Sequence, residues 1–358
     1  LISLAIGMLC TRKKIENRSF YAKEGFITVA LGWIALSVSG ALPFIISGEI
    51  PDIFNALFES ISGYTTTGAT ILSDVESLSK CLLFWRSFTH WIGGMGVLVF
   101  VLCILPLAGG NNMHLMRAES PGPSVGKLVP KVRSTATILY GIYTALTVIE
   151  CILLLLGGMT LFDAITTSMA TAGTGGFGIK NDSITSYSSY IQWVITVFMI
   201  LFGVNFNSYY LLIYGNIKKA LAVEEVRYYF LIIFASILFI FINILHLYDS
   251  AFDALTKAAF QVGSIITTTG FSTADFDLWP EASKTIIVFL MFVGACAGST
   301  GGGIKVSRFV IVFKNMIKEL NCYIHPKSVK KVKFEGKPID HDVVRSINVH
   351  FITFMVVF

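Results

Sequence analysis

The chain has 358 residues, of which 54% are apolar and 14% are charged, and its mean hydropathy is +0.72. A soluble protein of this length needs far more charge to cover its surface, so the composition excludes that class and indicates a polytopic membrane protein. The chain begins and ends inside apolar runs and has no initiator Met, so we expect it to be part of a longer protein.

Five apolar stretches are long enough to cross about 30 Å of hydrocarbon as helices. They cover residues 25–47, 91–108, 134–157, 190–214 and 228–248. A sixth stretch begins near Thr285, is interrupted at 298–303 and resumes over 306–317. Residues 343–358 begin another apolar stretch.

Three shorter apolar runs lie between these stretches. They begin near Phe54, Phe162 and Phe252, and each ends in Thr and Gly. The runs are compatible with helices but are too short to span a membrane, which predicts re-entrant half-helices followed by loops. Membranes tolerate such loops only where the backbone lines a water-filled cavity.

Basic residues predict the orientation of these segments. Four segments, 11–24, 109–133, 214–227 and 305–337, hold 21 of the 27 Lys and Arg residues, and we assign them to the cytoplasmic side. The segments on the opposite side are rich in Asp and Glu, so all three re-entrant runs enter from outside. The net charge of +5 is therefore explained by the basic residues on the cytoplasmic side of the membrane, and it gives no reason to expect nucleic-acid binding. The basic face can contact anionic lipid or a soluble partner.

Internal repetition is the strongest feature of the sequence. A shift of 108 residues aligns Gly68, with the apolar run before it, onto Gly176. A shift of 202 residues aligns the Thr-Thr-Thr-Gly run at 65–68 with an identical run at 267–270. The repeated unit is a helix, a short re-entrant helix, a Thr/Gly loop and a second helix, and it occurs three times.

The Thr/Gly loops have the composition of a cation filter. A dehydrated monovalent cation needs a ring of oxygen dipoles, and backbone carbonyls supply them without a fixed charge that traps the ion. Glycine readily reaches the backbone angles that point successive carbonyls at one axis. The partly negative C-terminal ends of the half-helices also favour a cation. A single loop of this kind would be read as a turn, but three in matching register favour a filter. The candidate ion-binding residues are Thr66, Thr67, Gly68, Thr174, Gly175, Gly176, Thr268, Thr269 and Gly270.

Several motifs carry a family resemblance that runs nearly end to end. They are TTGAT at 66–70, TGGF at 174–177, TTGFS at 268–272, FWRS at 84–87 with WIGGMG at 91–96, and GSTGGGIK at 298–305. By these motifs the chain resembles the Trk/Ktr/HKT superfamily of cation transporters, and within it the TrkH-type potassium-uptake subunits.

The resemblance implies an all-α polytopic membrane protein, with helix–re-entrant pore helix–helix repeats in a pseudo-fourfold arrangement around one pore. It also implies K⁺ as the transported ion, no cofactor, and a multi-pass location in the cell inner membrane or plasma membrane. The expected partners are a second copy of the chain, membrane lipid and a cytoplasmic nucleotide-binding regulatory ring of the TrkA type. The family's filter glycines correspond to Gly68, Gly176 and Gly270, and the fourth filter segment is expected beyond residue 358.

The chain then divides into three complete repeats and the start of a fourth. The predicted segments are the end of an N-terminal transmembrane helix with a cytoplasmic linker (1–24), repeat one (25–108), a cytoplasmic loop (109–133), repeat two (134–214), a cytoplasmic loop (215–227), repeat three (228–317), a cytoplasmic loop (318–342) and the start of repeat four (343–358).

The segment 298–303 places four glycines inside a spanning helix. It does not match a phosphate loop, because the GxxxxGK pattern would need Lys at 304, where Ile stands. It is either a packing kink or, as the resemblance implies, an intramembrane loop that gates the pore below the filter. Lys305 would need water or a carboxylate at mid-membrane, or would snorkel if it lies nearer the cytoplasmic edge. The candidate gate residues are Gly298, Ser299, Thr300, Gly301, Gly302, Gly303 and Lys305.

Other polar residues in apolar segments have open interpretations. Arg86 and His90 begin a spanning helix and are either interfacial anchors or part of a pore vestibule. Asn205 and Asn207 fall in the last helix of repeat two, where interhelical hydrogen bonding is favoured over contact with ions. Glu150 lies inside an apolar helix, and the sequence identifies no basic partner for it.

Three functional classes follow from these features. A K⁺-conducting uptake pore is favoured over an H⁺- or Na⁺-coupled secondary transporter, which would need an intramembrane carboxylate such as Glu150. An intramembrane enzyme is disfavoured because no nucleophile–base–acid arrangement is found. The His and Cys residues show no ligand spacing, so no transition-metal site is predicted. The six Cys residues are expected to be small buried or lipid-facing residues.

Overall fold

The computed structural model describes residues 22–96, 132–213, 215–326 and 331–357, and most of these residues are helical. The α-helices are α2 (Ala22–Ser47), α3 (Ile53–Tyr64), α4 (Lys80–Gly94), α7 (Val132–Leu156), α8 (Leu161–Ala172), α9 (Ser189–Phe202), α10 (Phe206–Ile213), α11 (Ile217–Ala222), α12 (Glu224–Ile244), α13 (Ala251–Ile266), α14 (Glu281–Val293), α15 (Val306–Ile324) and α16 (His341–Val357). The remaining elements are 3₁₀ turns at Leu245–Leu247 and Phe276–Leu278 and the strands β1 (Lys333–Phe334) and β2 (Lys337–Pro338). The predicted linker up to residue 21, most of the predicted loop 109–133, and the residues Cys10, Cys103 and His114 lie outside the described residues.

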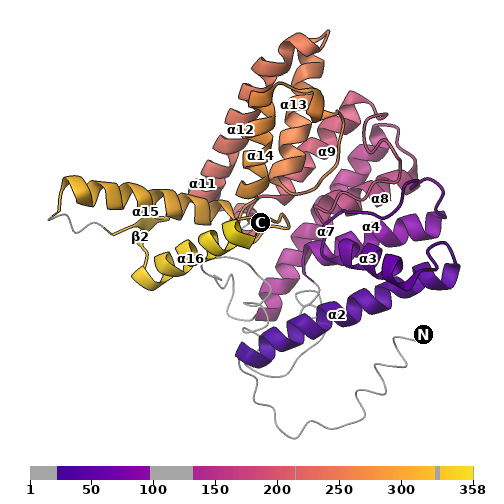
Figure 1. The fold of residues 1–358 in the computed structure, drawn as a ribbon, viewed down its shortest axis with the longest axis horizontal. Coiled ribbons are helices and arrows are strands. Elements are labelled where there is room, and N and C mark those ends of the chain that lie inside the picture. Colours follow the sequence, from indigo (N-terminus) through magenta and orange to yellow (C-terminus); the bar gives the residue numbers. More distant parts are fainter. Residues whose placement is uncertain (1–21, 97–131, 214, 327–330, 358) are drawn as a thin grey trace, which may run out of the picture.

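The helices form three units, each built of a helix, a short middle helix and a second helix (Figure 1). The units are α2–α3–α4, α7–α8–α9 and α12–α13–α14, and in each of them the short middle helix packs against both of its neighbours. The second helix of one unit also packs against the middle helix of the next, with α4 on α8 and α9 on α13. Figure 1 shows the units in chain order, from indigo through magenta to orange. The predicted repeat of helix, short helix and helix is therefore present in the fold.

Three helical segments are long and apolar enough to cross a membrane, or up to four if a bent pair counts as one span, within the part of the chain that the structure describes. They are Phe26–Ser47, Ala136–Leu156 and Glu224–Leu247, and the bent pair is α9 with α10. Large apolar side chains stay exposed on them; on α12, Leu231, Phe234 and Ile242 are 60%, 68% and 63% exposed. Such a surface suits lipid better than water.

Two predicted spans are broken more strongly than the sequence analysis expected. The stretch 190–214 forms two helices, α9 and α10, bent by 93° relative to each other. Asn205 lies in this break and Asn207 just after it, so they do not belong to one continuous helix as predicted. Asn205 Nδ2 donates a hydrogen bond to Glu225 at 3.3 Å, and Asn205 Oδ1 accepts the Asn207 N–H at 2.9 Å. Asn205 thus binds a neighbouring helix, but from a break and not from a helix face.

The second break is longer than predicted. Helix α14 ends at Val293 and α15 begins at Val306, so the interruption covers 294–305 and not only 298–303. The helix ends early because Gly294 has a φ of 63°, which a right-handed helix cannot accommodate. We call residues 294–305 the glycine loop.

Helix α4 also differs from prediction. It runs from Lys80 to Gly94, whereas the apolar stretch expected to cross the membrane begins at Trp91, with Arg86 and His90 just before it. The polar side chains Arg86 and His90 lower the hydropathy of this helix, although both are buried in the fold. Residues 97–108 of the predicted span lie outside the described residues.

The last part of the chain attaches to the start of α12. Helix α15 continues to Ile324, where the sequence predicts a cytoplasmic loop, and it packs against α12 and α16. Lys314 on α15 pairs with Glu224 and donates to the Lys333 carbonyl at 2.9 Å. Glu224 also accepts the Glu335 N–H at 2.9 Å, so the β1–β2 hairpin is connected to α12 and α15.

Candidate ion-conduction site

The three middle helices end at equivalent residues. Helices α3, α8 and α13 end at Tyr64, Ala172 and Ile266, which are related by the same shifts of 108 and 202 residues that align the loops. Each helix begins at a side-chain N-cap, in which Asp52, Thr160 and Ser250 accept backbone N–H groups at 2.9, 3.2 and 3.2 Å. At its other end, each helix places its partly negative C-terminus beside the Thr/Gly loop that follows it.

The loops that follow these helices have one backbone structure. We call them loop one (65–71), loop two (173–179) and loop three (267–273). In each loop the residue before the filter glycine donates its N–H to the carbonyl five residues earlier. The pairs are Thr67–Ser62, Gly175–Ala170 and Thr269–Ser264, at N–O distances of 2.9, 3.1 and 2.8 Å. The matching hydrogen bonds show that the sequence register of the repeats is also their structural register.

Left-handed residues alternate along each loop. The φ angles of Thr66, Thr174 and Thr268 are 53°, 49° and 58°, and those of Gly68, Gly176 and Gly270 are 76°, 79° and 86°. Such angles cost a non-glycine residue on the order of 1 kcal/mol and persist where the surroundings enforce them. Here each Thr hydroxyl donates to the carbonyl of the preceding residue, at 2.8, 2.7 and 2.6 Å in loops one, two and three. The sequence analysis expected such angles at glycine and did not anticipate them at Thr.

Two of the three candidate filter glycines bring neighbouring loops into contact. A Cβ atom on Gly68 would overlap the Gly175 carbonyl oxygen of loop two, and one on Gly176 would overlap the Thr269 carbonyl oxygen of loop three. Gly175 and Thr269 stand at equivalent positions, so in both contacts a glycine faces the carbonyl of the residue just before the glycine of the next loop. Loop two therefore lies between loops one and three, and only a residue without a side chain fits at either contact.

The side chains at two positions of the loops differ. In loops one and three, two Thr hydroxyls pair with each other, Thr65 with Thr67 at 2.9 Å in an exposed pair and Thr267 with Thr269 at 2.8 Å in a buried pair. In loop two the equivalent positions are glycines, and His90 occupies the space behind them, its Nδ1 accepting the Phe177 N–H at 3.5 Å.

Arg86 and His90 are 2% and 0% exposed. The expectation that they are interfacial anchors is therefore wrong, because both side chains pack behind the loops. The alternative, a contribution to the electrostatics of a pore vestibule, stays a prediction.

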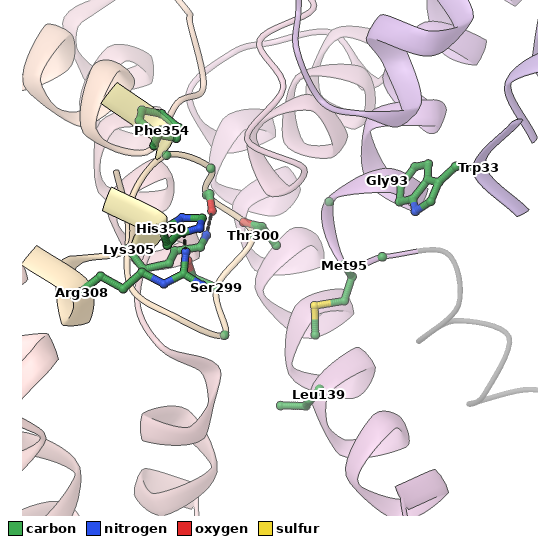
Figure 2. A pocket seen from close by; sticks show the side chains of 16 residues that line it. Trp33, Gly93, Met95, Leu139, Ser299, Thr300, Lys305, Arg308, His350 and Phe354 are labelled. Atoms are coloured by element: carbon green, nitrogen blue, oxygen red, sulfur yellow. Dashed lines mark hydrogen bonds between the residues drawn. The ribbon is translucent and has the colours of Figure 1, made fainter. Parts of the chain in front are cut away.

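The glycine loop contacts loop three from one side and lines a cavity on the other. The Gly302 N–H donates to Thr268 Oγ1 at 2.7 Å, and Thr300 Oγ1 donates to the Phe202 carbonyl at 3.2 Å. The cavity has a volume of about 410 Å³ and is lined by Gly298–Gly303, by Gly93–Gly96 at the C-terminal end of α4, and by residues of α2, α7, α15 and α16. Figure 2 shows Trp33, Gly93 and Met95 across the cavity from the glycine loop.

Positive side chains gather on the glycine-loop side of this cavity (Figure 2). Lys305 is 3% exposed and donates to the Gly301 carbonyl, so it neither snorkels nor faces bulk water. Its negative neighbour is Glu225, whose carboxylate accepts the Ala297 N–H at 2.7 Å and the Ser307 N–H at 3.0 Å. Arg308 also lines the cavity, with its Nη1 2.5 Å from His350 Nε2.

Comparison with known proteins identifies the family. A family model described as "TrkH: Cation transport protein" matches residues 1–358. The chain belongs to the TrkH family.

Its relatives include the Trk system potassium uptake protein TrkH of Salmonella typhimurium, 38% identical over 368 residues that cover 100% of this chain and 75% of the relative. TrkG of Escherichia coli K12 is 35% identical over 347 residues, covering 95% of this chain and 71% of the relative. The crystal structure of the potassium transporter TrkH from Vibrio parahaemolyticus matches with a TM-score of 0.87 at 33% identity, covering 99% of this chain and 75% of that chain.

These matches confirm the resemblance and the all-α membrane fold that the sequence predicts. As a TrkH-family chain with exposed apolar helices, the protein is a multi-pass membrane transport protein and not an enzyme. The structure brings all nine candidate ion-binding residues into three adjacent loops, and the seven candidate gate residues into the glycine loop beside loop three.

Sequence reasoning missed several buried polar residues near the loops. Glu59 and Glu225 are 1% and 3% exposed, whereas Glu150 is the one carboxylate that the sequence analysis placed deep in a spanning helix. A signal for Glu59 existed, because the shift of 202 residues aligns it with the polar Gln261.

Glu150 is fully buried on α7 beside Thr171, whose hydroxyl donates to the Thr167 carbonyl. Neither a basic partner for Glu150 nor a cluster of three metal-ligating side chains occurs in the described parts of the chain.

Proposed function

We propose that this chain takes up K⁺ across the cell membrane through a selective, gated pore. The filter would be formed by residues 66–68, 174–176 and 268–270, together with a fourth segment beyond residue 358. The observation that carries the proposal is the common backbone of the three loops, with left-handed residues at the same alternate positions. The relatives named as potassium uptake proteins support K⁺ as the ion.

Loop geometry provides the physical reason for selectivity. Alternating left-handed residues turn successive carbonyls toward one side of the loop, where they can replace the hydration shell of a cation. The side-chain hydroxyls of Thr66, Thr174 and Thr268 donate to the carbonyl of the preceding residue and so hold the backbone in this conformation. The C-terminal ends of α3, α8 and α13 add a negative potential that favours a cation.

The function is tested by ion flux into liposomes that hold the full-length protein, with and without its cytoplasmic partner. We expect K⁺ to enter faster than Na⁺ and its flux to follow the electrochemical gradient of K⁺ alone. Flux that requires an H⁺ or Na⁺ gradient would instead favour the coupled transporter, in which the buried Glu150 would be the first residue to substitute.

The architecture around the filter follows from the same proposal. The repeats at 25–108, 134–214 and 228–317 and a fourth that begins at 343–358 would surround one pore in a pseudo-fourfold arrangement. Two copies of the chain would associate with one pore each, in the cell inner membrane or plasma membrane, in contact with lipid. A TrkA-like nucleotide-binding ring would bind the cytoplasmic face, where the basic segments lie.

The glycine loop is the proposed gate. Residues 298–303 lie between loop three and the cavity, and Lys305 and Arg308 place positive charge beside that cavity. A loop rich in glycine can change its backbone at low cost, and a positive charge resists a cation. The loop is joined through Glu225 to α12, whose neighbouring Glu224 holds the β1–β2 hairpin, so a partner at the hairpin has a mechanical route to the gate.

Deletion of residues 301–303 tests the gate. We expect higher basal K⁺ flux and weaker dependence on the partner, with the K⁺/Na⁺ preference nearly unchanged. A folded deletion variant with wild-type flux and regulation would show that the loop is only a packing kink and not a gate.

A further inference from the structure

A buried ion pair lies behind loops one and two. Arg86 Nε is 2.7 Å from Glu59 Oε1, and the two side chains are 2% and 0% exposed. Of the ion pairs between described residues, it is the one whose partners are both fully buried. Glu59 belongs to the pore helix α3 and Arg86 to α4. Two charges buried away from water need good geometry and further hydrogen bonds to other groups. The groups that bind this pair therefore indicate what the pair holds in place.

The carboxylate binds the end of loop one. Thr70 Oγ1 lies 3.0 Å from both carboxylate oxygens of Glu59, and the Ile71 N–H donates to Oε2 at 3.2 Å. Thr70 and Ile71 lie two and three residues after the filter glycine Gly68. Glu59 therefore anchors the outgoing end of loop one to the pore helix that precedes it.

The guanidinium extends the connection to loop two. Arg86 Nη1 donates to the Gly178 carbonyl at 3.2 Å, and the guanidinium carbon lies 4.0 Å from the centre of the Phe177 ring. Arg86 Nη2 also donates to Thr70 Oγ1 at 3.3 Å. One side chain thus holds the residues that follow the filter in both loops, across the contact between Gly68 and Gly175.

The third repeat shows that the fold does not need a charge here. The residue 202 positions after Glu59 is Gln261, whose Nε2 donates to the Ala274 carbonyl at 2.9 Å just beyond loop three. The residue 108 positions after Glu59 is Thr167. A neutral side chain therefore supports the same kind of loop in repeat three, and the ion pair is particular to the junction of loops one and two.

We propose that Glu59 and Arg86 are positioning residues for cation selectivity, which hold loops one and two in register so that their carbonyls keep the spacing that favours K⁺. The proposal rests on the filter function of these loops. Carbonyl ligands discriminate between ions by their spacing and by how closely that spacing is maintained, so loosening one junction affects Na⁺ and K⁺ differently. A buried pair is weak evidence for stability, which favours a positional role over a stabilising one.

The test measures K⁺ and Na⁺ permeability of the full-length protein in liposomes for E59Q, R86M and the double variant E59Q/R86M. E59Q introduces the residue that repeat three carries at the same register. Each single variant is expected to lower the K⁺/Na⁺ permeability ratio about fivefold, which corresponds to roughly 1 kcal/mol of differential ion binding. The double variant is expected to be no less selective than the worse single variant, because it leaves no unpaired charge.

Two further variants keep the result interpretable. The control is E281Q, which removes the exposed partner of Lys284 in a surface ion pair and is expected to leave the ratio unchanged. If E59Q and R86M do not fold, T70V removes the hydroxyl shared by the pair and is expected to lower the ratio in the same direction. Folded variants that all keep the wild-type ratio would overturn the positioning role alone. A wild-type protein without K⁺ preference would overturn the filter function as well.

Discussion

Loops two and three have the same backbone conformation, but different side chains pack behind them. Loop three carries Thr267 and Thr269, whose hydroxyls pair with each other at 2.8 Å behind the filter. Loop two carries glycines at these positions, where a Cβ at Gly173 would overlap the His90 carbonyl and a Cβ at Gly175 would overlap the His90 imidazole. The His90 ring also stacks on Phe177 with a centroid distance of 4.1 Å, so loop two is supported by another element rather than by itself.

This difference separates what the filter requires from what merely supports it. Alternate left-handed residues occur in both loops, and the two loops meet where Gly176 of loop two lies against the Thr269 carbonyl of loop three. The groups behind the loop can be hydroxyls or an imidazole. Substitutions at the two glycines that contact a neighbouring carbonyl, Gly68 and Gly176, should therefore act alike, whereas substitutions behind the loops should act differently in each loop.

The largest effect is expected where the loops are alike. Gly176→Ser and Gly68→Ser each place a Cβ against a neighbouring carbonyl and force the loops apart. We expect each to lower the K⁺/Na⁺ permeability ratio by about tenfold or more, as 1.4 kcal/mol of lost discrimination would give. The control is Gly158→Ser, which has a φ of 90° but no described atom within 4 Å of its Cβ. Equal effects at all three positions would point to backbone strain and not to contact between loops.

The second prediction tests where the loops differ. Gly175→Ala in loop two places a methyl group against the His90 ring, and overpacking of this kind costs about 1–3 kcal/mol. We expect K⁺ flux to fall about tenfold, and the double variant H90A/G175A to recover part of the loss because it removes the overlap. The counterpart Thr269→Ala in loop three should have a smaller effect than Gly175→Ala. A double variant that is worse than either single variant would show that His90 has a role beyond filling space.

A smaller effect is expected from the link between loop three and the glycine loop. Thr268→Val removes the acceptor of the Gly302 N–H, a hydrogen bond worth about 1 kcal/mol. We expect basal K⁺ flux to rise up to about fivefold and dependence on the cytoplasmic partner to weaken. Thr66→Val in loop one removes the equivalent hydroxyl and serves as the matched comparison. If both variants change regulation equally, the link to the glycine loop is not what controls the gate.

The smallest effects should come from the N-caps, which support the loops only at a distance. Asp52→Ala, Thr160→Ala and Ser250→Ala each remove one cap of a pore helix. We expect each to lower the free energy of unfolding by about 1 kcal/mol, measured as thermal stability in detergent. The K⁺/Na⁺ ratio should not change. A cap variant that alters selectivity would mean that the pore helix itself moves relative to its loop.

Much of the fold could be predicted because its signals are local or periodic. Apolar length gives the spanning helices, and the shifts of 108 and 202 residues align loops whose backbone hydrogen bonds match. The prediction failed at the positions where these helices begin to break. Gly294 ends α14 and the 93° bend separates α9 from α10, yet hydropathy averages over both breaks.

By itself the sequence determined the class of protein, the repeat and the candidate filter residues, since composition, period and loop chemistry can be read from neighbouring residues. Only the tertiary structure decided what stands behind the filter. Arg86 and His90 are too polar to be predicted as buried, and their partners Gly178 and Gly175 lie more than 80 residues away along the chain. Burial of a charge or an imidazole depends on partners that are distant along the chain, such as Glu59 of the same repeat and loop two of the next, and such packing is not encoded in any local pattern.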